Sequence, residues 1–232
     1  MTDHLRSPQL GQNWLKTPLT RRNEPLLTVP MLALFPLSQP LFPDGILALR
    51  VFETRYLSLI DQCQRDDVPF GVVTLQDGYE VQVEGVDETL THIGCLAHIV
   101  EVRELQPGLL AVHCVGGDRF RVTSGERDGQ GLWHAEVQML EPDLATDIPP
   151  DLQPMADRLG ALIADSQRQG IEDRLPVTRP YRLDECGWVA NQWAHLVNLG
   201  IEQKVSILDE DDPLRRLTIV KMLLDRPDPD LT

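Results

Sequence analysis

The sequence predicts an α+β protein in which a β-rich half comes first and a helical half follows. Three observations support this fold class. Short apolar and β-branched runs separated by turns fill residues 29–142, and a Pro- and Asp-containing linker follows at 143–150. From 151 to 225 the apolar residues recur at helical spacing instead. Strands followed by helices, without alternation between them, are typical of α+β proteins.

The two ends of the chain lack these patterns. Residues 1–28 are polar, carry several prolines and show no hydrophobic period, so we expect a loosely ordered leader. The sequence leaves open whether the native protein begins at Met1 or at Met31. Residues 226–232 alternate Asp with Pro, which predicts a frayed tail.

The first elements of the β-rich half are marked by a turn. In Pro43-Asp44-Gly45 the proline fixes φ, the aspartate caps and the glycine accepts positive φ. A strand over 46–51 should follow, and then a helix over 52–65 and a β-branched strand over 70–75. An acidic loop is expected at 84–88.

Four further strands are expected before the linker, at 93–103, 109–115, 120–123 and 132–140. The first two flank Gln106-Pro107-Gly108 and should form a hairpin. In the last, Ala135 and Val137 share one face while Glu136 and Gln138 share the other, which is typical of a half-buried strand. About six short strands with one helix indicate a small, partly closed barrel.

Three main helices are expected in the helical half. The first carries an apolar stripe from Leu152 and ends at Gly170. The second begins at Asp184, and the third begins at Asp212-Pro213, a good N-cap followed by a first-turn proline. A shorter helix over 202–208 should lie between them.

The charge of the chain is strongly negative. Its 21 basic and 36 acidic residues give a formal charge of -15, divided as +2 over 1–30, -10 over 31–142 and -7 over 143–232. Nucleic-acid and anionic-membrane binders depend on Lys and Arg to neutralise phosphate. We therefore expect neither nucleic acid nor membrane as a partner.

Four cysteines are widely spaced and form no CxxC pair, so they are expected to be reduced thiols of a cytoplasmic protein. His92, Cys95, His98, His113 and Cys114 suggest metal ligands at first. A regular strand over 92–98 would point Cys95 away from the two histidines, so no metal or other cofactor is predicted. A cysteine hydrolase using Cys114 or Cys186 is a weaker hypothesis, because no nucleophile–base–orienter set emerges.

Five ordered blocks of the β-rich half resemble the amino-terminal, substrate-binding domain of ATP-dependent Lon proteases. They are Phe35-Pro36-Leu37 with Leu41-Phe42-Pro43-Asp44-Gly45, Leu49-Arg50-Val51-Phe52-Glu53-Thr54-Arg55-Tyr56, Phe70-Gly71-Val72-Val73, Ile93-Gly94-Cys95-Leu96-Ala97 and Gly117-Asp118-Arg119-Phe120-Arg121. The helical half is also similar, especially at Asp212-Pro213-Leu214-Arg215-Arg216-Leu217. The resemblance covers about 31–224 and implies a PUA-like β pseudobarrel followed by an α-helical bundle.

The resemblance implies a binding module rather than an enzyme. No Walker loop is present, because only Lys16 is followed by Thr and Leu15 stands where glycine is required. The family's Ser–Lys dyad belongs to a separate C-terminal domain. The expected function is binding of unfolded polypeptide or a partner protein in an apolar groove between barrel and helices, linked to protein quality control.

Six residues are candidates for contacting the polypeptide: Phe42, Pro43, Glu53, Arg55, Arg119 and Trp188. The alternative for Glu53, Arg55 and Arg119 is a structural role, in which the arginine pins neighbouring elements together. Trp188 and Trp193 lie five residues apart, so one of them is expected in the core and the other partly exposed. Other functions left open are a small-ligand or RNA-binding PUA-like module and an unrecognised hydrolase, and the oligomeric state is also open.

Overall fold

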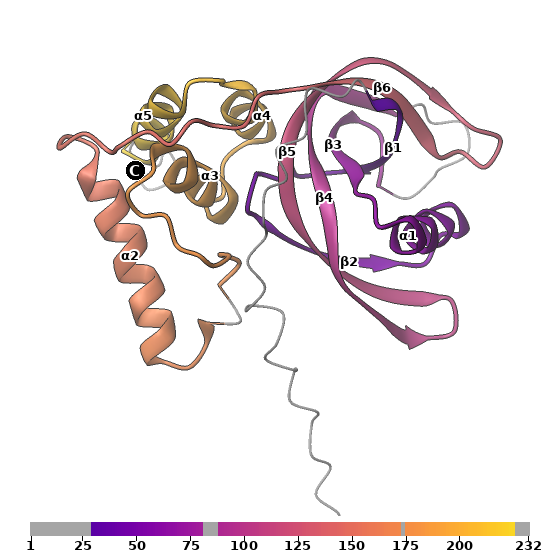
Figure 1. The fold of residues 1–232 in the computed structure, drawn as a ribbon, viewed down its shortest axis with the longest axis horizontal. Coiled ribbons are helices and arrows are strands. Elements are labelled where there is room, and N and C mark those ends of the chain that lie inside the picture. The colour runs from indigo at the N-terminus through magenta and orange to yellow at the C-terminus, as the bar shows by residue number, and fades with distance from the viewer. Residues whose placement is uncertain (1–28, 81–87, 173–174, 226–232) are drawn as a thin grey trace, which may run out of the picture.

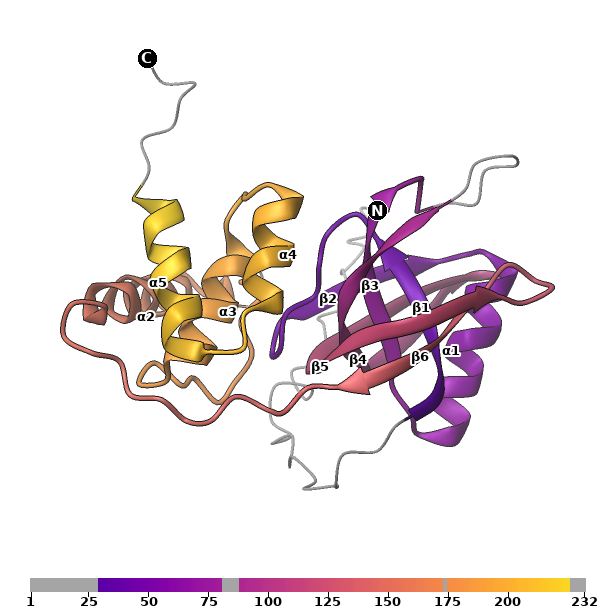
Figure 2. The ribbon, with the colours of Figure 1, turned by 90° about the horizontal axis from the view of Figure 1, so that it is seen from above.

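The computed structural model describes residues 29–80, 88–172 and 175–225 (Figure 1). The expected leader (1–28), the expected tail (226–232) and residues 84–87 of the acidic loop lie outside the described residues. Within them, the strands and four of the helices form two masses that lie side by side (Figures 1 and 2). The first helix packs on the strand side.

Six strands and five helices occupy the described residues, so the predicted α+β class is confirmed. The strands are β1 (Val29–Leu37), β2 (Ile46–Val51), β3 (Phe70–Asp77), β4 (Thr89–Gln106), β5 (Leu109–Arg127) and β6 (Trp133–Met139). The helices are α1 (Thr54–Asp66), α2 (Gln153–Arg168), α3 (Cys186–Leu196), α4 (Ile201–Asp209) and α5 (Pro213–Leu224).

The sheet closes on itself to form a barrel. Its strand order is β2-β5-β4-β3-β1-β6, and β6 also pairs with β5. Strand β1 runs parallel to β3, with Leu34 opposite Gly71, and antiparallel to β6. Alternation in β6 is as predicted, because Ala135 and Val137 are buried while Glu136 and Gln138 are exposed. The closed circuit contains β5, β4, β3, β1 and β6, and β2 lies outside it.

Glycine permits tight packing around Phe120 inside the barrel. A Cβ atom on Gly94 would lie 2.5 Å from Cζ of Phe120 and 2.5 Å from the carbonyl oxygen of Val72. A Cβ atom on Gly71 would lie 2.8 Å from the same ring. Because these distances are shorter than van der Waals contact, the closed barrel requires glycine beside the buried phenylalanine.

The segments 109–115 and 120–123, predicted as separate strands, belong to one long strand, β5. Gly116 and Gly117 lie between the two predicted segments. There the strand passes close to the turn before β2, where a Cβ atom on Gly116 would lie 2.0 Å from the Phe42 carbonyl oxygen. The first half of β5 pairs with β2 and the second half pairs with β6. One strand therefore serves both the barrel wall and a projecting three-stranded arm formed by β2 with parts of β5 and β4.

Two local details also differ from the sequence prediction. Strand β1 was not predicted, because Pro30 and Pro36 interrupt its apolar pattern. In the Pro43-Asp44-Gly45 turn it is Asp44 that has positive φ, at 61°. Gly45 is needed for space instead, since a Cβ atom there would lie 2.9 Å from the Phe42 carbonyl oxygen.

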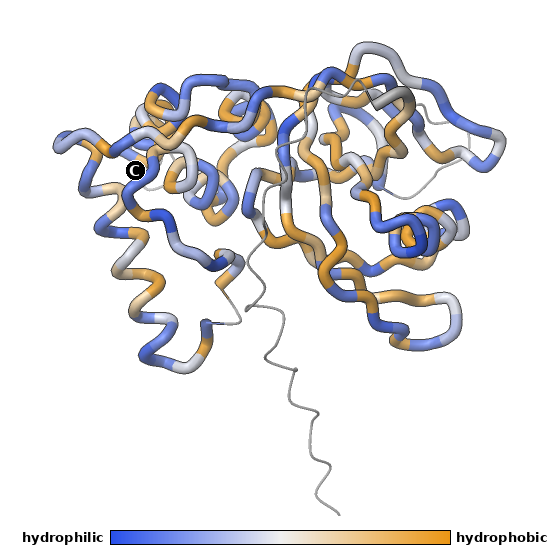
Figure 3. Tube along the Cα trace, in the orientation of Figure 1, coloured by the Kyte–Doolittle hydropathy of each residue, from blue (hydrophilic) through white to orange (hydrophobic). Residues whose placement is uncertain are grey.

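Helix α3 is the centre of the helical half, and all nine residues from Cys186 to Ala194 are buried. Hydrophobic and hydrophilic bands alternate along α2 (Figure 3), which packs Met155, Leu159 and Ile163 inward. The predicted cap of α5 is confirmed, because Asp212 accepts a hydrogen bond of 2.9 Å from the backbone amide of Leu214.

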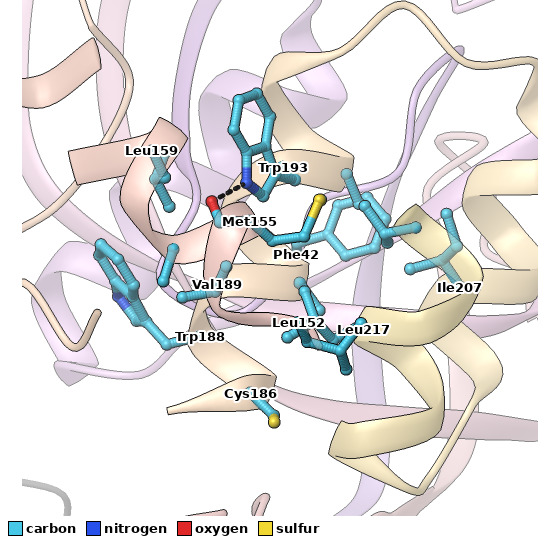
Figure 4. Close-up of a cluster of buried hydrophobic side chains, with 14 of the residues drawn as sticks. Phe42, Leu152, Met155, Leu159, Cys186, Trp188, Val189, Trp193, Ile207 and Leu217 are labelled. Carbon is cyan, nitrogen blue, oxygen red and sulfur yellow. Dashed lines mark hydrogen bonds between the residues drawn. The ribbon is translucent and has the colours of Figure 1, made fainter. Parts of the chain in front are cut away.

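Phe42 connects the barrel to the helices. It is fully buried, and it packs among helical residues such as Met155, Trp193 and Ile207 (Figure 4). Burying a phenylalanine side chain contributes about 1.5–3 kcal/mol. A residue from the turn before β2 is thus part of the helical core.

Candidate functional site

The junction between barrel and helices is held by two buried arginines. Arg119 from β5 donates through Nη1 to the carbonyl oxygens of Leu208, at 2.7 Å, and Glu210, at 2.9 Å. Arg216 from α5 is fully buried, and its Nη2 donates to Oδ1 of Asp143 at 3.0 Å. Asp143 also lies 3.4 Å from Nη2 of Arg119. One carboxylate therefore joins β5, α5 and the segment that links the two halves.

The electrostatic balance at this junction is tight. Burial lowers the pKa of Arg119, and the charge of Arg216 lowers it further, while Asp143 opposes both. Two like charges out of water are tolerated only when a carboxylate and several carbonyls satisfy them. These contacts make the junction a structural joint, which is the alternative role predicted for Arg119.

The hollow beside this joint is small and polar. Its volume is about 20 Å³, enough for one water molecule. Its walls carry the carboxylates of Asp44, Asp118, Glu141, Asp143 and Glu185. At this point between barrel and helices the hollow is lined mostly by polar side chains, in contrast to the apolar groove that was expected there.

Most residues predicted to contact polypeptide are interior. Phe42 is 0% exposed, Trp188 is 2% exposed, and Arg55 and Arg119 are each 4% exposed. Pro43 and Glu53 are half-buried. The expectation that one of the two tryptophans is partly exposed is wrong, because Trp193 is also buried and its Nε1 donates to the Met155 carbonyl oxygen at 3.0 Å (Figure 4).

Arg55 fastens the start of α1 to the barrel. Its Nε donates to Oε2 of Glu53 at 3.1 Å, and its Nη1 donates to the Gly131 carbonyl oxygen at 2.7 Å. The guanidinium also lies 4.4 Å from the centroid of the Tyr56 ring. This geometry matches the structural alternative for the Glu53–Arg55 pair.

The four cysteines are free and buried. Burial raises the pKa of Cys63 to about 11 and that of Cys114 to about 12, and it also raises the pKa values of Cys95 and Cys186. A thiol held protonated in this way is a poor nucleophile.

Two of the three histidines weighed as metal ligands have other partners. His92 lies 3.2 Å from Asp209, and His113 lies 3.3 Å from Glu101. No group of three or more His, Cys, Asp or Glu side chains that could hold a metal is found among residues 29–80, 88–172 and 175–225. Over the same ranges no helix is long and apolar enough to cross a membrane.

The outer edge of β2 is an open sheet edge. On one side β2 pairs with β5 along its whole length, from Ile46 opposite Val115 to Val51 opposite Leu110. On the other side the Ile46 carbonyl oxygen accepts a hydrogen bond of 3.0 Å from Nε2 of His195. Because backbone groups alternate between the two sides of a strand, those of Ala48 also point outward.

The same alternation points the backbone groups of Arg50 outward. In the described part of the chain, neither Ala48 nor Arg50 has a strand partner on this side. These two residues, between Ile46 and Val51, define what we term the β2 edge.

A short intramolecular segment already pairs beside this edge. Gly45 forms an isolated antiparallel bridge with Val177, and Oγ1 of Thr178 donates to the Asp44 carbonyl oxygen at 2.8 Å. The pairing does not continue along β2, because Pro176 has no amide hydrogen and the Leu175 amide donates to Glu172 at 3.1 Å. The β2 edge is therefore left free just beyond the bridge.

The other open edge of the arm, that of β4, carries more charged side chains. Beyond Ala97, β4 has no β3 partner, and its residues there include the charged Glu101, Arg103 and Glu104. Charged side chains are a common protection of edge strands. The β2 edge carries a single charged side chain, that of Arg50, and the residue that follows β2 is Phe52, which is 54% exposed. Phe52 lies inside the family-like block, yet a sequence pattern alone gives no sign of its exposure.

Comparisons with known proteins agree with this fold. The family described as the ATP-dependent protease La (LON) substrate-binding domain matches residues 31–226. Lon protease 2 of Myxococcus xanthus is 27% identical over 190 residues, which are 80% of this chain and 22% of that protein. The chain thus spans about a fifth of the length of this curated relative.

Two solved structures share the fold. The Lon N-terminal domain protein from Xanthomonas campestris is 31% identical with a TM-score of 0.66, over 86% of this chain and 100% of that one. The N-terminal domain of a Mycobacterium avium complex Lon protease is 16% identical with a TM-score of 0.56, over 85% of this chain and 100% of that one, and its likeness concerns the fold alone. The family model matches residues 31–226, and the closed barrel and helical half agree with a solved Lon N-terminal domain. This chain therefore belongs to the Lon substrate-binding domain family.

Proposed function

We propose that this chain is a non-enzymatic module that binds extended polypeptide, which adds as a strand to the β2 edge. The observation that carries the proposal is the open backbone of Ala48 and Arg50, which ends at the exposed Phe52. Strand addition to a sheet edge supplies main-chain hydrogen bonds and needs no particular client sequence. This mode suits a family described by substrate binding.

Phe52 supplies the apolar contact that backbone pairing lacks. Aromatic side chains are enriched among the residues that carry most of the energy of protein interfaces. The neighbouring Glu53 is half-buried beside it, which makes it the sequence-predicted residue best placed to touch a client. Phe42, Arg55, Arg119 and Trp188 support the scaffold in this proposal and do not contact the client.

The wider role that we propose is in protein quality control in the cytoplasm, together with a protease that acts in trans. The family supports the quality-control link. Free cysteines fit a reducing compartment. The net charge of -15 favours polypeptide over nucleic acid as the partner. Burial of the thiols supports a non-enzymatic role over a cysteine hydrolase.

The proposal can be tested with an unfolded polypeptide, fluorescein-labelled β-casein, in an anisotropy titration. Ala48→Pro removes one outward amide hydrogen, and Phe52→Ala removes the anchor. A hydrogen bond contributes about 0.5–1.5 kcal/mol, so the first change should weaken binding about threefold to tenfold. The second should weaken it by about tenfold or more.

Matched controls separate the β2 edge from general stickiness. Tyr79→Ala and Leu105→Ala remove side chains that are 61% and 49% exposed at other places on the barrel half, and neither should change binding. Thermal unfolding checks that each variant is folded. The proposed site would be contradicted if both edge variants bind casein as tightly as the wild type, or if the control variants lose casein binding equally. The proposed function would be contradicted if the wild-type chain binds no casein.

A further inference from the structure

We infer that Arg50 makes the β2 edge selective, so that the bound strand carries an acidic residue opposite Arg50 and an apolar residue on either side of it, two positions away. The inference rests on the proposed function, because it assigns a specificity to the same edge. It concerns side chains, whereas strand addition itself uses only the backbone.

Backbone pairing leaves the position of a client undetermined. A strand that slips by one residue turns every side chain to the other face of the sheet. A register is therefore fixed only where a side chain of the edge strand prefers one partner. In β2 the side chains of Leu49 and Val51 point into the barrel half and are buried, so the selective side chain must come from the opposite face.

The side chains on that opposite face are Ile46, Ala48 and Arg50, and Phe52 continues the alternation. Arg50 is exposed and has no ion-pair partner among the described residues, although the whole chain has 36 acidic residues. Its neighbour on β5 is the uncharged Ala111. One strand further, Arg103 is already paired with Glu101 at 2.8 Å. Arg50 is thus a free cation on an otherwise acidic protein, at the edge where a client would add.

A client residue opposite Arg50 would lie within reach of its guanidinium. Because the backbone groups of Arg50 point outward, the two residues would form a hydrogen-bonded pair with Cα atoms about 5.5 Å apart. Opposite charges at such positions stabilise a strand pair, and like charges destabilise it. Asp or Glu is therefore favoured at this client position, and Lys or Arg is disfavoured.

The flanking positions follow from the neighbours of Arg50. The client residue opposite Phe52 meets an exposed ring, and the one opposite Ala48 meets a methyl group that leaves room for a larger side chain. The bridge between Gly45 and Val177 is antiparallel, so a client that continues this pairing along β2 runs antiparallel to β2. Its sequence then follows the order apolar, any, acidic, any, apolar.

The test uses end-blocked seven-residue peptides with this pattern that differ only in Glu or Lys at the central position. Binding is followed by the backbone amide NMR shifts of Ala48 and Arg50 in the full chain. We expect the Glu peptide to bind about fivefold more tightly than the Lys peptide at low salt. The preference should shrink at 0.5 M NaCl, where ions screen exposed charges.

A charge reversal identifies the residue responsible. Arg50→Glu should invert the preference, so that the Lys peptide binds more tightly. Arg65→Glu changes the net charge equally on α1, where the arginine side chain is 66% exposed, and should leave the preference unchanged. The inference is overturned if Arg50→Glu keeps the preference for the Glu peptide, or if Arg50→Glu and Arg65→Glu lose that preference equally. In either case the proposed function still stands as long as the chain binds casein. If neither peptides nor casein shift the β2 edge, the proposed function itself fails.

Discussion

His195 on α3 donates a hydrogen bond of 3.0 Å from Nε2 to the carbonyl oxygen of Ile46, the first residue of β2. The open edge of the sheet therefore begins at a point fixed by the helical half. Burial lowers the pKa of His195, and the nearby Lys204 lowers it further, while the hydrogen bond to Ile46 opposes the change. Burial likewise lowers the pKa of His98.

These shifts predict that acid weakens the fold. Because the folded pKa values lie below the ordinary histidine value of 6.5, the unfolded chain binds more protons than the folded chain as the pH falls. The stability contribution is thus fully present above pH 6.5 and is lost as the pH falls through the folded values. The free energy of unfolding, measured with urea at pH 7.0 and at pH 5.5, should differ less between the two pH values in His195→Gln than in the wild type. Glutamine at this position keeps a hydrogen-bond donor for Ile46. The exposed His92→Gln serves as the control and should retain the wild-type difference.

Asp143 should be the most sensitive carboxylate of the junction. Its replacement by Ala leaves the buried Arg216 without its ion-pair partner, which costs about 3–5 kcal/mol in comparable buried pairs. Denaturant unfolding would measure this loss. Asp225→Ala removes a partly exposed partner of Lys221 and should cost less than about 1 kcal/mol. If Asp143→Ala and Asp225→Ala lose similar amounts of unfolding free energy, the junction does not depend on Asp143.

Barrel closure should depend on Gly94. In Gly94→Ala the new methyl group overlaps the Phe120 ring and the Val72 carbonyl, and overpacking of this kind costs about 1–3 kcal/mol or more. Gly129→Ala is a matched control, because nothing lies within 4 Å of a Cβ atom there. A difference in melting temperature between the two variants is expected, and equal melting temperatures would contradict the tight interior.

The thiols should report on unfolding. All four cysteines are buried, and burial raises their pKa values, so a thiol reagent at pH 8 should modify the folded chain slowly and the urea-unfolded chain at all four positions. Absorbance of the released thiolate follows the reaction. Rapid modification of Cys186 in the native protein would contradict its burial and reopen the hydrolase hypothesis.

Local sequence signals predicted most of the elements correctly. Turn residues and periodicity placed β2, β3, α4 and the capped start of α5, because each of these depends on neighbours along the chain. The pattern failed for β1, where the ladder tolerates two prolines, and for the continuity of β5 through Gly116. Both depend on which distant strands pair, and one sequence does not encode that locally.

The candidate site was less predictable from sequence. The chemically distinctive residues, Arg119 and Trp188, are buried because the fold uses them in its interior. Ala48 and Arg50 are candidates for binding because they have no strand partner on their outer side in the described part of the chain. A missing strand partner cannot be recognised from the sequence. The exposure of Phe52 likewise follows only once β2 is known to lie outside the closed circuit.

Phe42 also has a consequence for synthesis on the ribosome. Most members of the buried cluster to which Phe42 belongs lie between positions 152 and 220, more than a hundred residues downstream. Translation proceeds at about 5–20 residues per second, and the barrel can close once β6 has emerged. For several seconds, therefore, a nascent barrel displays an unburied aromatic ring, and only completion of the last helices withdraws it from chaperones and neighbouring chains.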